Sequence, residues 1–257
     1  MNRDKINIGS CAFRKDGWLN LDKPCPHYSS RQNSIDLPHD LMTFDPLGIR
    51  DNALTGAYTS HTIEHLSDAH VEHLFKEVHR ILEVGGVFRI TCPDIGRCHD
   101  AYIKNDKEYI SNWLLNPRGH EAYRACGLGE QFLFIFASYI SPYRKHIIDA
   151  GHLGQVKKYC EDEITDIFKN KSREDALDFF TSECQKYAPV LQSRHPGEHI
   201  SWWDYNKLND LLKLIGFKNI ELQTFNKSNY DVFKNFDECN EDNVKALNYT
   251  LFVECRK

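Results

Sequence analysis

The sequence predicts an α/β protein built on a mostly parallel sheet, with a large helical insertion. Short apolar strands alternate with an amphipathic helix through the first hundred residues, and the alternation returns after residue 200. Between these regions, residues 96–200 lose the strand pattern and are rich in aromatic, Lys, Arg and His side chains. Strands that alternate with helices along a chain usually form a parallel sheet with helices on its faces.

The first strands end on residues that can contact a ligand. Residues 6–8 predict one strand and residues 18–21 a second. Residues 57–59 continue a third strand, which ends at Ser60 and His61. Ligands of such sheets bind at the carboxyl ends of the strands, near the point where the strand order switches. These strand ends are therefore the first candidates for a functional site.

An amphipathic helix follows the third strand. Ser67 is predicted to cap its start, because a serine hydroxyl can accept an otherwise unsatisfied backbone N–H. The apolar positions that recur at helical spacing are Val71, Leu74, Phe75, Val78 and Leu82. Gly85 and Gly86 are predicted to end the helix, and residues 87–91 to form a strand that Pro93 stops.

The α/β pattern returns near the end of the chain. Residues 205–215 predict a second amphipathic helix, with Gly216 as its C-terminal cap. The apolar face of this helix consists of Leu208, Leu211, Leu212 and Ile215. Residues 220–225 and 249–254 then predict two final strands, joined by a polar loop of hairpin length.

The composition limits the kinds of partner that we expect. The chain has 257 residues and a net charge of -5, so no nucleic-acid or anionic-membrane surface is expected, because both need a basic footprint. A chain of this length can bury a large core, so no metal is expected to support the fold. Nine cysteines stand singly, without C-x-x-C spacing, and the first four residues start no apolar signal segment. These features predict a cytoplasmic protein with free thiols.

Four stretches of the sequence together resemble the class I S-adenosylmethionine-dependent methyltransferases, and most of all the methyltransferase type 11 branch. They are INIGSCAFRKDGWLNLD, DLPHDLMTFDPLGIRDNALTGAYTSHTIEHL, HLFKEVHRILEVGGVFRITCPD and WWDYNKLNDLLKLIGFKNIEL. The resemblance covers residues 5–95 and 200–257. It implies one domain, residues 1–257, with a Rossmann-like seven-stranded sheet in the order 3-2-1-4-5-7-6 and an antiparallel last strand. The resemblance does not cover residues 96–200, which their composition predicts to be a helical insertion, or lid, that covers the acceptor site.

The same resemblance implies that S-adenosylmethionine is the cofactor. Asp22 would accept hydrogen bonds from the ribose hydroxyls, and Gly9 would let the backbone pass close to the amino-acid tail. Ser10 and Cys11 would offer backbone N–H groups to the carboxylate of the cofactor, and Asp40 would lie near the adenine amino group. Two simpler interpretations stay open: Asp22 can be a solvated residue at a strand end, and Gly9 a plain turn glycine.

The acceptor side has several candidate residues. Ser60 and His61 would face the methionine part of the cofactor, and His61 is a candidate base. His199 and Asp94 are further candidates for a catalytic role. The insertion carries many Arg and His residues on an acidic protein, which favours an anionic acceptor. The acceptor-binding candidates are Arg97, Arg118, His120 and His195. Surface helices often carry such residues in any case, and a histidine at a helix start can simply cap or pack.

We therefore expect a methyltransferase that acts on an oxygen of a small anionic or sugar-like acceptor in surface-polysaccharide biosynthesis. The acceptor would be a phosphorylated or nucleotide-linked sugar, or a phosphate or phosphoramidate group. Three alternatives stay open. The aromatic run at residues 132–139 could line a pocket for a quinone or a lipid, and the glycine-poor loop could mark a non-catalytic binding protein. Residues 61–65 also match the H-x-x-E-H arrangement of inverted zinc peptidases, which requires one long helix.

Overall fold

The computed structural model describes residues 3–11, 13–25, 35–114, 117–237 and 246–257, and the chain divides into two compact units. The sheet unit consists of Met1–Pro93, Asp204–Asn240 and Thr250–Lys257. The helical unit consists of Asp94–Trp203 and Glu241–Tyr249.

The sheet unit contains a seven-stranded sheet in the order β3-β2-β1-β4-β5-β7-β6. Its strands are β1 (Lys5–Ile8), β2 (Leu19–Asp22), β3 (Leu37–Pro38), β4 (Leu54–Ser60), β5 (Leu82–Pro93), β6 (Lys218–Leu222) and β7 (Thr250–Arg256). β7 runs antiparallel to β5 and β6, and the other neighbouring strands are parallel. The predicted strand order is confirmed. The prediction that the last strand along the chain, β7, is antiparallel is also confirmed.

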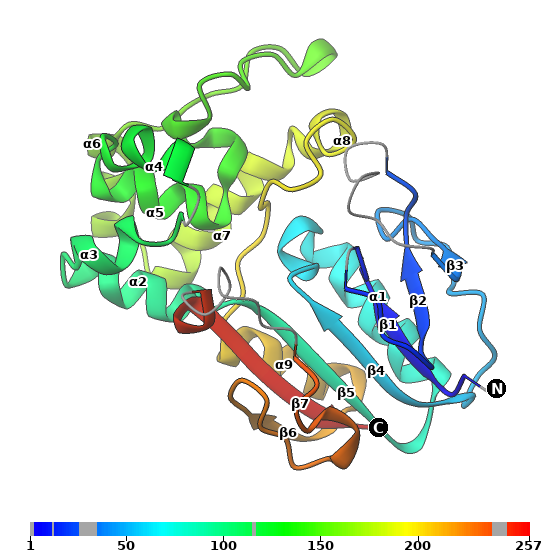
Figure 1. The fold of residues 1–257 in the computed structure, drawn as a ribbon. Coiled ribbons are helices and arrows are strands. Elements are labelled where there is room, and N and C mark those ends of the chain that lie inside the picture. The colour runs from blue at the N-terminus through cyan, green and yellow to red at the C-terminus, as the bar shows by residue number, and fades with distance from the viewer. Residues whose placement is uncertain (1–2, 12, 26–34, 115–116, 238–245) are drawn as a thin grey trace. The chain divides into compact units, whose positions relative to one another are not determined.

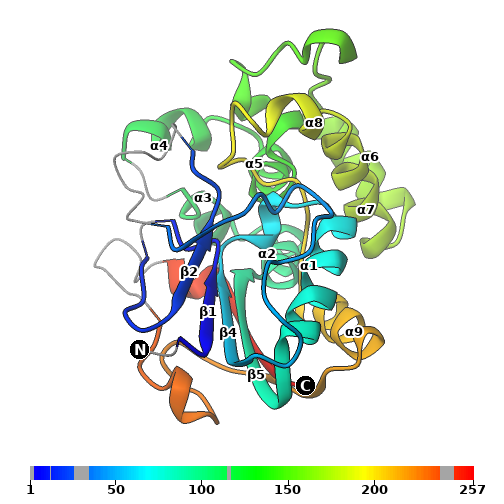
Figure 2. The same ribbon diagram turned by 90° about the vertical axis from the view of Figure 1, so that its right-hand side faces the viewer.

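β1 lies at the middle of the parallel part of the sheet. Ile6 pairs with Leu19 of β2 on one side and with Ala57 of β4 on the other. Ile6 and Ile8 are fully buried, as expected for a parallel strand that is covered on both faces. Figure 2 shows β2, β1, β4 and β5 side by side in that order.

Two helices of the sheet unit, α1 (Asp68–Ile81) and α9 (Tyr205–Ile215), lie on the same face of the sheet, behind it in Figure 1. Their predicted caps are confirmed. The Ser67 side chain accepts the backbone N–H of His70, and Gly216 ends α9 with φ +114°. The end predicted for α1 is wrong. The helix stops at Ile81, and Leu82 is extended because it already begins β5 and pairs with Leu54.

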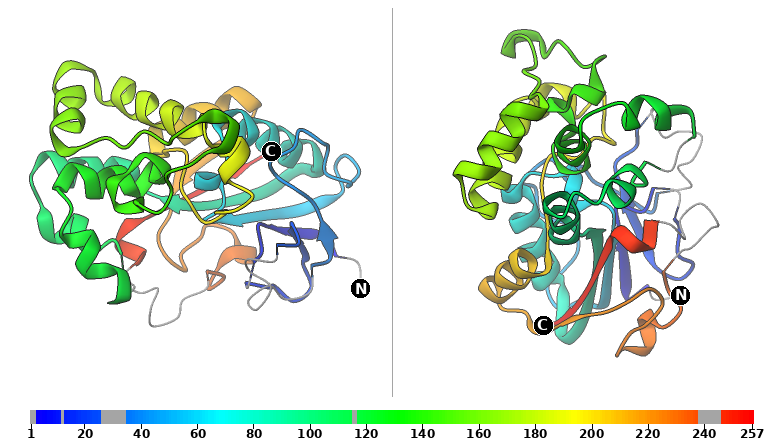
Figure 3. Two further views of the ribbon diagram at one scale, coloured as in Figure 1. Left: turned by 90° about the horizontal axis from the view of Figure 1, so that it is seen from above. Right: turned by 90° about the vertical axis from the view of Figure 1, so that its left-hand side faces the viewer.

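The opposite face of the sheet is covered by residues 224–237, which follow β6. The sequence predicted a short polar loop there, which is wrong. The segment contains the 3-10 helix η6 (Asp231–Phe233), and Phe233 and Phe236 are buried against Trp18 and Tyr58. The ring centroids of Phe236 lie 4.6 Å from Trp18 and 4.7 Å from Tyr58. In the left view of Figure 3, this orange segment and the two helices lie on opposite sides of the sheet.

A buried arginine ties this covering segment to the strands beneath it. Arg89 of β5 is 0% exposed. Its guanidinium forms ion pairs with Asp237 at 2.5 Å and with Glu254 of β7 at 2.6 Å, and it donates to the carbonyl oxygens of Thr224 and Lys227. A buried charge is tolerated only when such partners compensate its desolvation. Arg89 therefore holds residues 224–237 in place.

The helical unit is built around α5 (Leu128–Phe136). Phe132, Leu133, Ile135 and Phe136 are each fully buried in its core. The other helices of this unit are α2 (Ile95–Ile103), α3 (Lys107–Ser111), α4 (Pro117–Arg124), α6 (Glu161–Asn170), α7 (Arg173–Gln185) and α8 (Ala188–Leu191). Its 3-10 helices are η3 (Ser138–Ile140), η4 (Pro142–Arg144), η5 (Gly151–Leu153) and η7 (Ala246–Tyr249). Among the described residues, no helix combines the length and apolar character needed to cross a membrane.

Candidate functional site

The carboxyl ends of β1, β2, β3 and β4 meet at one edge of the sheet unit. The loop Gly9-Ser10-Cys11 follows β1, Asp22 ends β2, Asp40 follows β3, and Ser60 ends β4. The backbone N–H groups of Gly9 and Ser10 both donate to the carbonyl oxygen of Leu21, at 2.9 and 3.1 Å. These bonds fold the loop back onto the end of β2. Residues predicted from separate strands therefore lie at one edge.

Gly9 allows the loop to pack closely against the end of β4. Its φ is +69°, a conformation that glycine adopts without strain. A Cβ atom at this position would lie 2.3 Å from Oγ1 and 2.7 Å from Cγ2 of Thr62. Thr62 was not among the predicted site residues, and nothing in the sequence links it to Gly9. The glycine is required both by the backbone conformation and by this neighbour.

Asp22 closes the loop. Its Oδ2 accepts the backbone N–H of Cys11 at 2.6 Å, and its Oδ1 accepts that of Lys23 at 2.7 Å. Cys11 has φ +39°, a left-handed backbone conformation that costs about 1–2 kcal/mol. The backbone N–H groups of Ser10 and Cys11, which were predicted to face a cofactor, are thus bonded to Leu21 and Asp22.

Asp40 lies beside a cation that the sequence analysis did not single out. Lys23 Nζ lies 2.5 Å from Asp40 Oδ2, and the backbone N–H of Met42 donates to Asp40 Oδ1 at 3.0 Å. Burial alone would raise the pKa of Asp40, but Lys23 and the Met42 N–H outweigh it and lower that pKa. The carboxylate is therefore kept ionised. A lysine directly after Asp22 was the available signal for this pair.

His61 sits at the end of β4 in an unusual backbone conformation, with φ +47°. Its backbone N–H donates to the carbonyl oxygen of Thr91 at 2.9 Å. Its ring Nδ1 lies 3.1 Å from Glu64 Oε1, and its Nε2 lies 3.3 Å from Thr250 Oγ1. Its neighbour Ser60 accepts a hydrogen bond from the Thr91 hydroxyl at 2.7 Å. Both ring nitrogens of His61 thus have a polar neighbour within the sheet unit.

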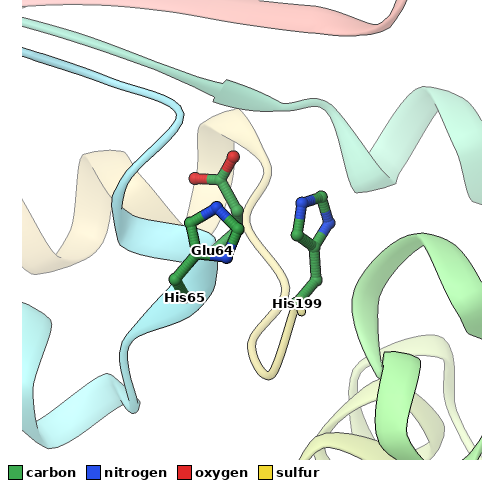
Figure 4. A group of neighbouring side chains, drawn as sticks. All are labelled: Glu64, His65 and His199. Carbon is green, nitrogen blue, oxygen red and sulfur yellow. The ribbon is translucent and has the colours of Figure 1, made fainter. Parts of the chain in front are cut away.

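The helix required by the H-x-x-E-H motif is absent at residues 61–65. Thr62 is the N-cap of the 3-10 helix η2 (Ile63–His65), so His61 precedes this short element and does not lie on it. The two histidines of the motif therefore do not share one helical face, and the inverted zinc peptidase interpretation loses its geometric basis. Figure 4 shows Glu64 and His65 on η2, and His199 on the segment that leads into α9.

The remaining candidates lie in the helical unit. Asp94 caps α2 by accepting the backbone N–H of Arg97 at 3.1 Å, and it pairs with Arg97 Nε at 3.2 Å. His199 Nδ1 lies 2.6 Å from the carbonyl oxygen of Ile135. The His195 ring lies 6.0 Å from that of His146, and Arg118 and His120 lie outside the residues whose side chains are described.

Comparisons with known proteins concern the fold. Neither protein-family models nor curated protein sequences give a match to this chain. Among solved structures, it is similar to a SAM-dependent methyltransferase from Archaeoglobus fulgidus, with TM-score 0.44, 11% identity, and coverage of 99% of this chain and 86% of that one. A methyltransferase from Mesorhizobium loti gives TM-score 0.42, 13% identity, and coverage of 98% and 90%.

A third solved structure is a complex of the Haloferax volcanii Trm112 methyltransferase activator with a methyltransferase. It gives TM-score 0.41, 11% identity, and coverage of 99% of this chain and 83% of that one. These likenesses are too distant to assign a substrate or partner. The order and directions of the seven strands define the chain as having the class I S-adenosylmethionine-dependent methyltransferase fold.

Proposed function

We propose that this protein transfers a methyl group from S-adenosylmethionine to an oxygen of a small acceptor. The observation that carries the proposal is the loop after β1, closed by Asp22 and packed on Thr62 through Gly9. It lies at the carboxyl edge of the methyltransferase sheet, where open α/β sheets bind their ligands.

Each part of the cofactor has a proposed partner at this edge. Asp22 binds the ribose, because it ends β2 at this edge and a carboxylate can accept the protons of both ribose hydroxyls. The loop at residues 9–11 takes the amino-acid tail. Asp40 lies near the adenine, with Lys23 as its counter-ion. Ser60 and His61 face the methionine part.

The proposed reaction is a direct displacement at the methyl carbon of the sulfonium. The acceptor oxygen forms the new bond, the carbon–sulfur bond breaks, and its electron pair stays on sulfur. The protein's main contribution is to align oxygen, carbon and sulfur and to keep water away. A hydroxyl acceptor also needs a base within hydrogen-bond reach, for which His61 is the candidate.

We propose a small anionic or sugar-like acceptor, of the kind used in surface-polysaccharide biosynthesis, and we assign its selection to the helical unit. The candidates there are Arg97, Arg118, His120, His195, His199 and Asp94. The rival interpretation, an apolar quinone or lipid acceptor, relied on residues 132–139. Those residues are buried in the core of their own unit, which favours the polar acceptor.

The first test is titration calorimetry with S-adenosylmethionine. We expect the wild-type chain to bind S-adenosylmethionine. Asp22→Ala should weaken this affinity about 10- to 100-fold, because a hydrogen bond to a charged group contributes about 1.5–3 kcal/mol. Asp22→Asn keeps an acceptor for the Cys11 N–H, and so separates loop closure from ribose binding. Asp16→Ala is the matched control, since Asp16 is fully exposed nearby.

The result that contradicts the proposal is a folded wild-type chain that does not bind S-adenosylmethionine. Such a chain would instead be a non-catalytic member of this fold. If binding is confirmed, a methyl-transfer screen across nucleotide sugars, phosphorylated metabolites and quinones identifies the acceptor. Equal affinity of the wild type and Asp22→Ala would remove Asp22 from the cofactor site.

A further inference from the structure

We propose that Glu64 is a positioning residue that keeps the proton of His61 on Nδ1 and leaves Nε2 as the base for a hydroxyl acceptor. This inference rests on the proposed function, and it makes the acceptor more specific. An acceptor that must lose a proton is a hydroxyl group, whereas an acceptor oxygen that is already anionic needs no base.

The two ends of the His61 ring have different environments. Glu64 is only 2% exposed, and its Oε1 lies 3.1 Å from Nδ1. The His61 side chain itself is 44% exposed. A buried carboxylate thus holds one nitrogen of a ring that is accessible to a second molecule. This is the arrangement in which a carboxylate orients a histidine base.

The position of the ring proton follows from what each group can donate and accept. An ionised carboxylate only accepts hydrogen bonds. Nδ1 of His61 must therefore carry the proton that bonds to Glu64. In the neutral ring, Nε2 then has its lone pair available.

Thr250 shows that a hydroxyl can reach this lone pair. It is the first residue of β7, and its Oγ1 lies 3.3 Å from Nε2. With the proton on Nδ1, the threonine hydroxyl is the donor and Nε2 the acceptor. A separation of 3.3 Å is long for a hydroxyl donor, so the bond is weak. During turnover, the acceptor hydroxyl replaces this weak bond as the donor to Nε2.

The backbone of His61 supports the same role. A non-glycine residue with φ +47° costs about 1–3 kcal/mol, and it persists only where its surroundings hold it. Here the Thr91 carbonyl oxygen holds the backbone N–H, and Glu64 holds the ring. Such strain is often found where a side chain must be aimed. The cost is consistent with a ring that has to face a ligand.

The proposed step transfers the methyl group to the acceptor oxygen and a proton to His61. The acceptor oxygen attacks the methyl carbon, and the carbon–sulfur bond gives its electron pair to sulfur, which becomes a neutral thioether. The acceptor O–H bond breaks, and its proton goes to Nε2. The ring becomes an imidazolium, which the Glu64 carboxylate stabilises. Release of that proton to water returns the neutral ring.

The tautomer of His61 can be measured without cofactor or acceptor. Nitrogen-15 NMR of histidine-labelled protein distinguishes a protonated Nδ1 from a protonated Nε2, and His61→Gln assigns the signal. We expect the Nδ1–H form in the wild type and a loss of this preference in Glu64→Gln. Glu77→Gln is the control, since Glu77 is also mostly buried but bonds Leu47 and Arg80. A protonated Nε2 in the neutral wild-type ring overturns the proposal.

Kinetics with the acceptor found by the screen give the second test. Glu64→Gln should lower kcat about 10- to 1000-fold, which is less than the about 100- to 10,000-fold that a general base itself contributes, and leave the affinity for S-adenosylmethionine within about twofold. Thr250→Val should keep the tautomer, because Glu64 and not Thr250 holds the proton on Nδ1. Equal turnover in Glu64→Gln and Glu77→Gln overturns the proposal. Absence of cofactor binding would refute the proposed function, while the tautomer result would still decide the role of Glu64.

Discussion

Replacement of Gly9 by alanine tests the packing on which the candidate cofactor loop depends. An alanine at φ +69° costs about 1–2 kcal/mol in backbone strain. Alanine also restricts the unfolded chain, which returns about 0.4–1 kcal/mol. The new Cβ would lie 2.3 Å from Thr62 Oγ1, and overpacking of this kind costs about 1–3 kcal/mol more. We expect Gly9→Ala to lower the free energy of unfolding by about 2–4 kcal/mol.

Gly17→Ala is the matched control for this substitution. Gly17 has φ +81°, but no atom lies within 4 Å of the position of its Cβ. It therefore carries the backbone strain without the steric overlap, and its cost should be about 1 kcal/mol. The difference between the two variants isolates the contact with Thr62.

Thermal unfolding is a suitable assay. One kcal/mol corresponds to about 2–4 °C for a chain of this size, so Tm should fall by about 2–4 °C in Gly17→Ala and by about 4–16 °C in Gly9→Ala. In a Thr62→Ala background, most of the extra loss at Gly9 should disappear, because the two closest atoms are removed. Equal losses at both glycines, with no recovery in the double variant, would refute the packing argument.

Two further predictions concern buried charges. Arg89→Met should lower the free energy of unfolding, measured by urea unfolding, by about 3–5 kcal/mol, because it leaves Asp237 and Glu254 buried without their cation. The control Lys76→Met breaks an exposed ion pair and should cost at most about 0.5 kcal/mol. Similar losses in the two variants would contradict the role of the buried charge. Burial lowers the pKa of Lys158 to about 8 in the folded chain, whereas an unfolded lysine has a pKa of about 10.4. Between these values the unfolded chain binds more protons, so the free energy of unfolding should rise between about pH 8 and 10. Urea unfolding over pH should show a smaller rise in Lys158→Met, and an unchanged rise would exclude this lysine as its source.

The elements that the sequence predicted well depend on local signals. Ser67 caps α1 through the N–H of a residue three positions away, and Gly216 ends α9 by its own φ of +114°. The failure at the end of α1 has the opposite origin. Gly85 and Gly86 look like a helix end, but Leu82 is drawn into β5 by its pairing with Leu54 of β4.

Part of the candidate site was also visible in the sequence. The predicted strand ends alone placed Gly9, Asp22 and His61 at one edge, because parallel strands bring their carboxyl ends together. The partners of these residues were not visible. Thr62 contacts the position of a Gly9 Cβ from the end of another strand, and Thr250 reaches His61 across 189 positions of the chain.

By itself, the sequence determined the class of sheet, the caps of its two helices and the residues at its carboxyl edge. These depend on turn residues, capping residues and apolar periodicity, all of which act over a few positions. Only the tertiary structure decided that residues 224–237 cover one face of the sheet, held by Arg89 through an Asp237 that is 148 positions away. It also decided that a buried Glu64 holds the His61 ring. Such contacts depend on packing. A buried charge needs an opposite charge beside it, and a buried aromatic ring needs neighbours that fill the space around it, wherever these residues lie along the chain.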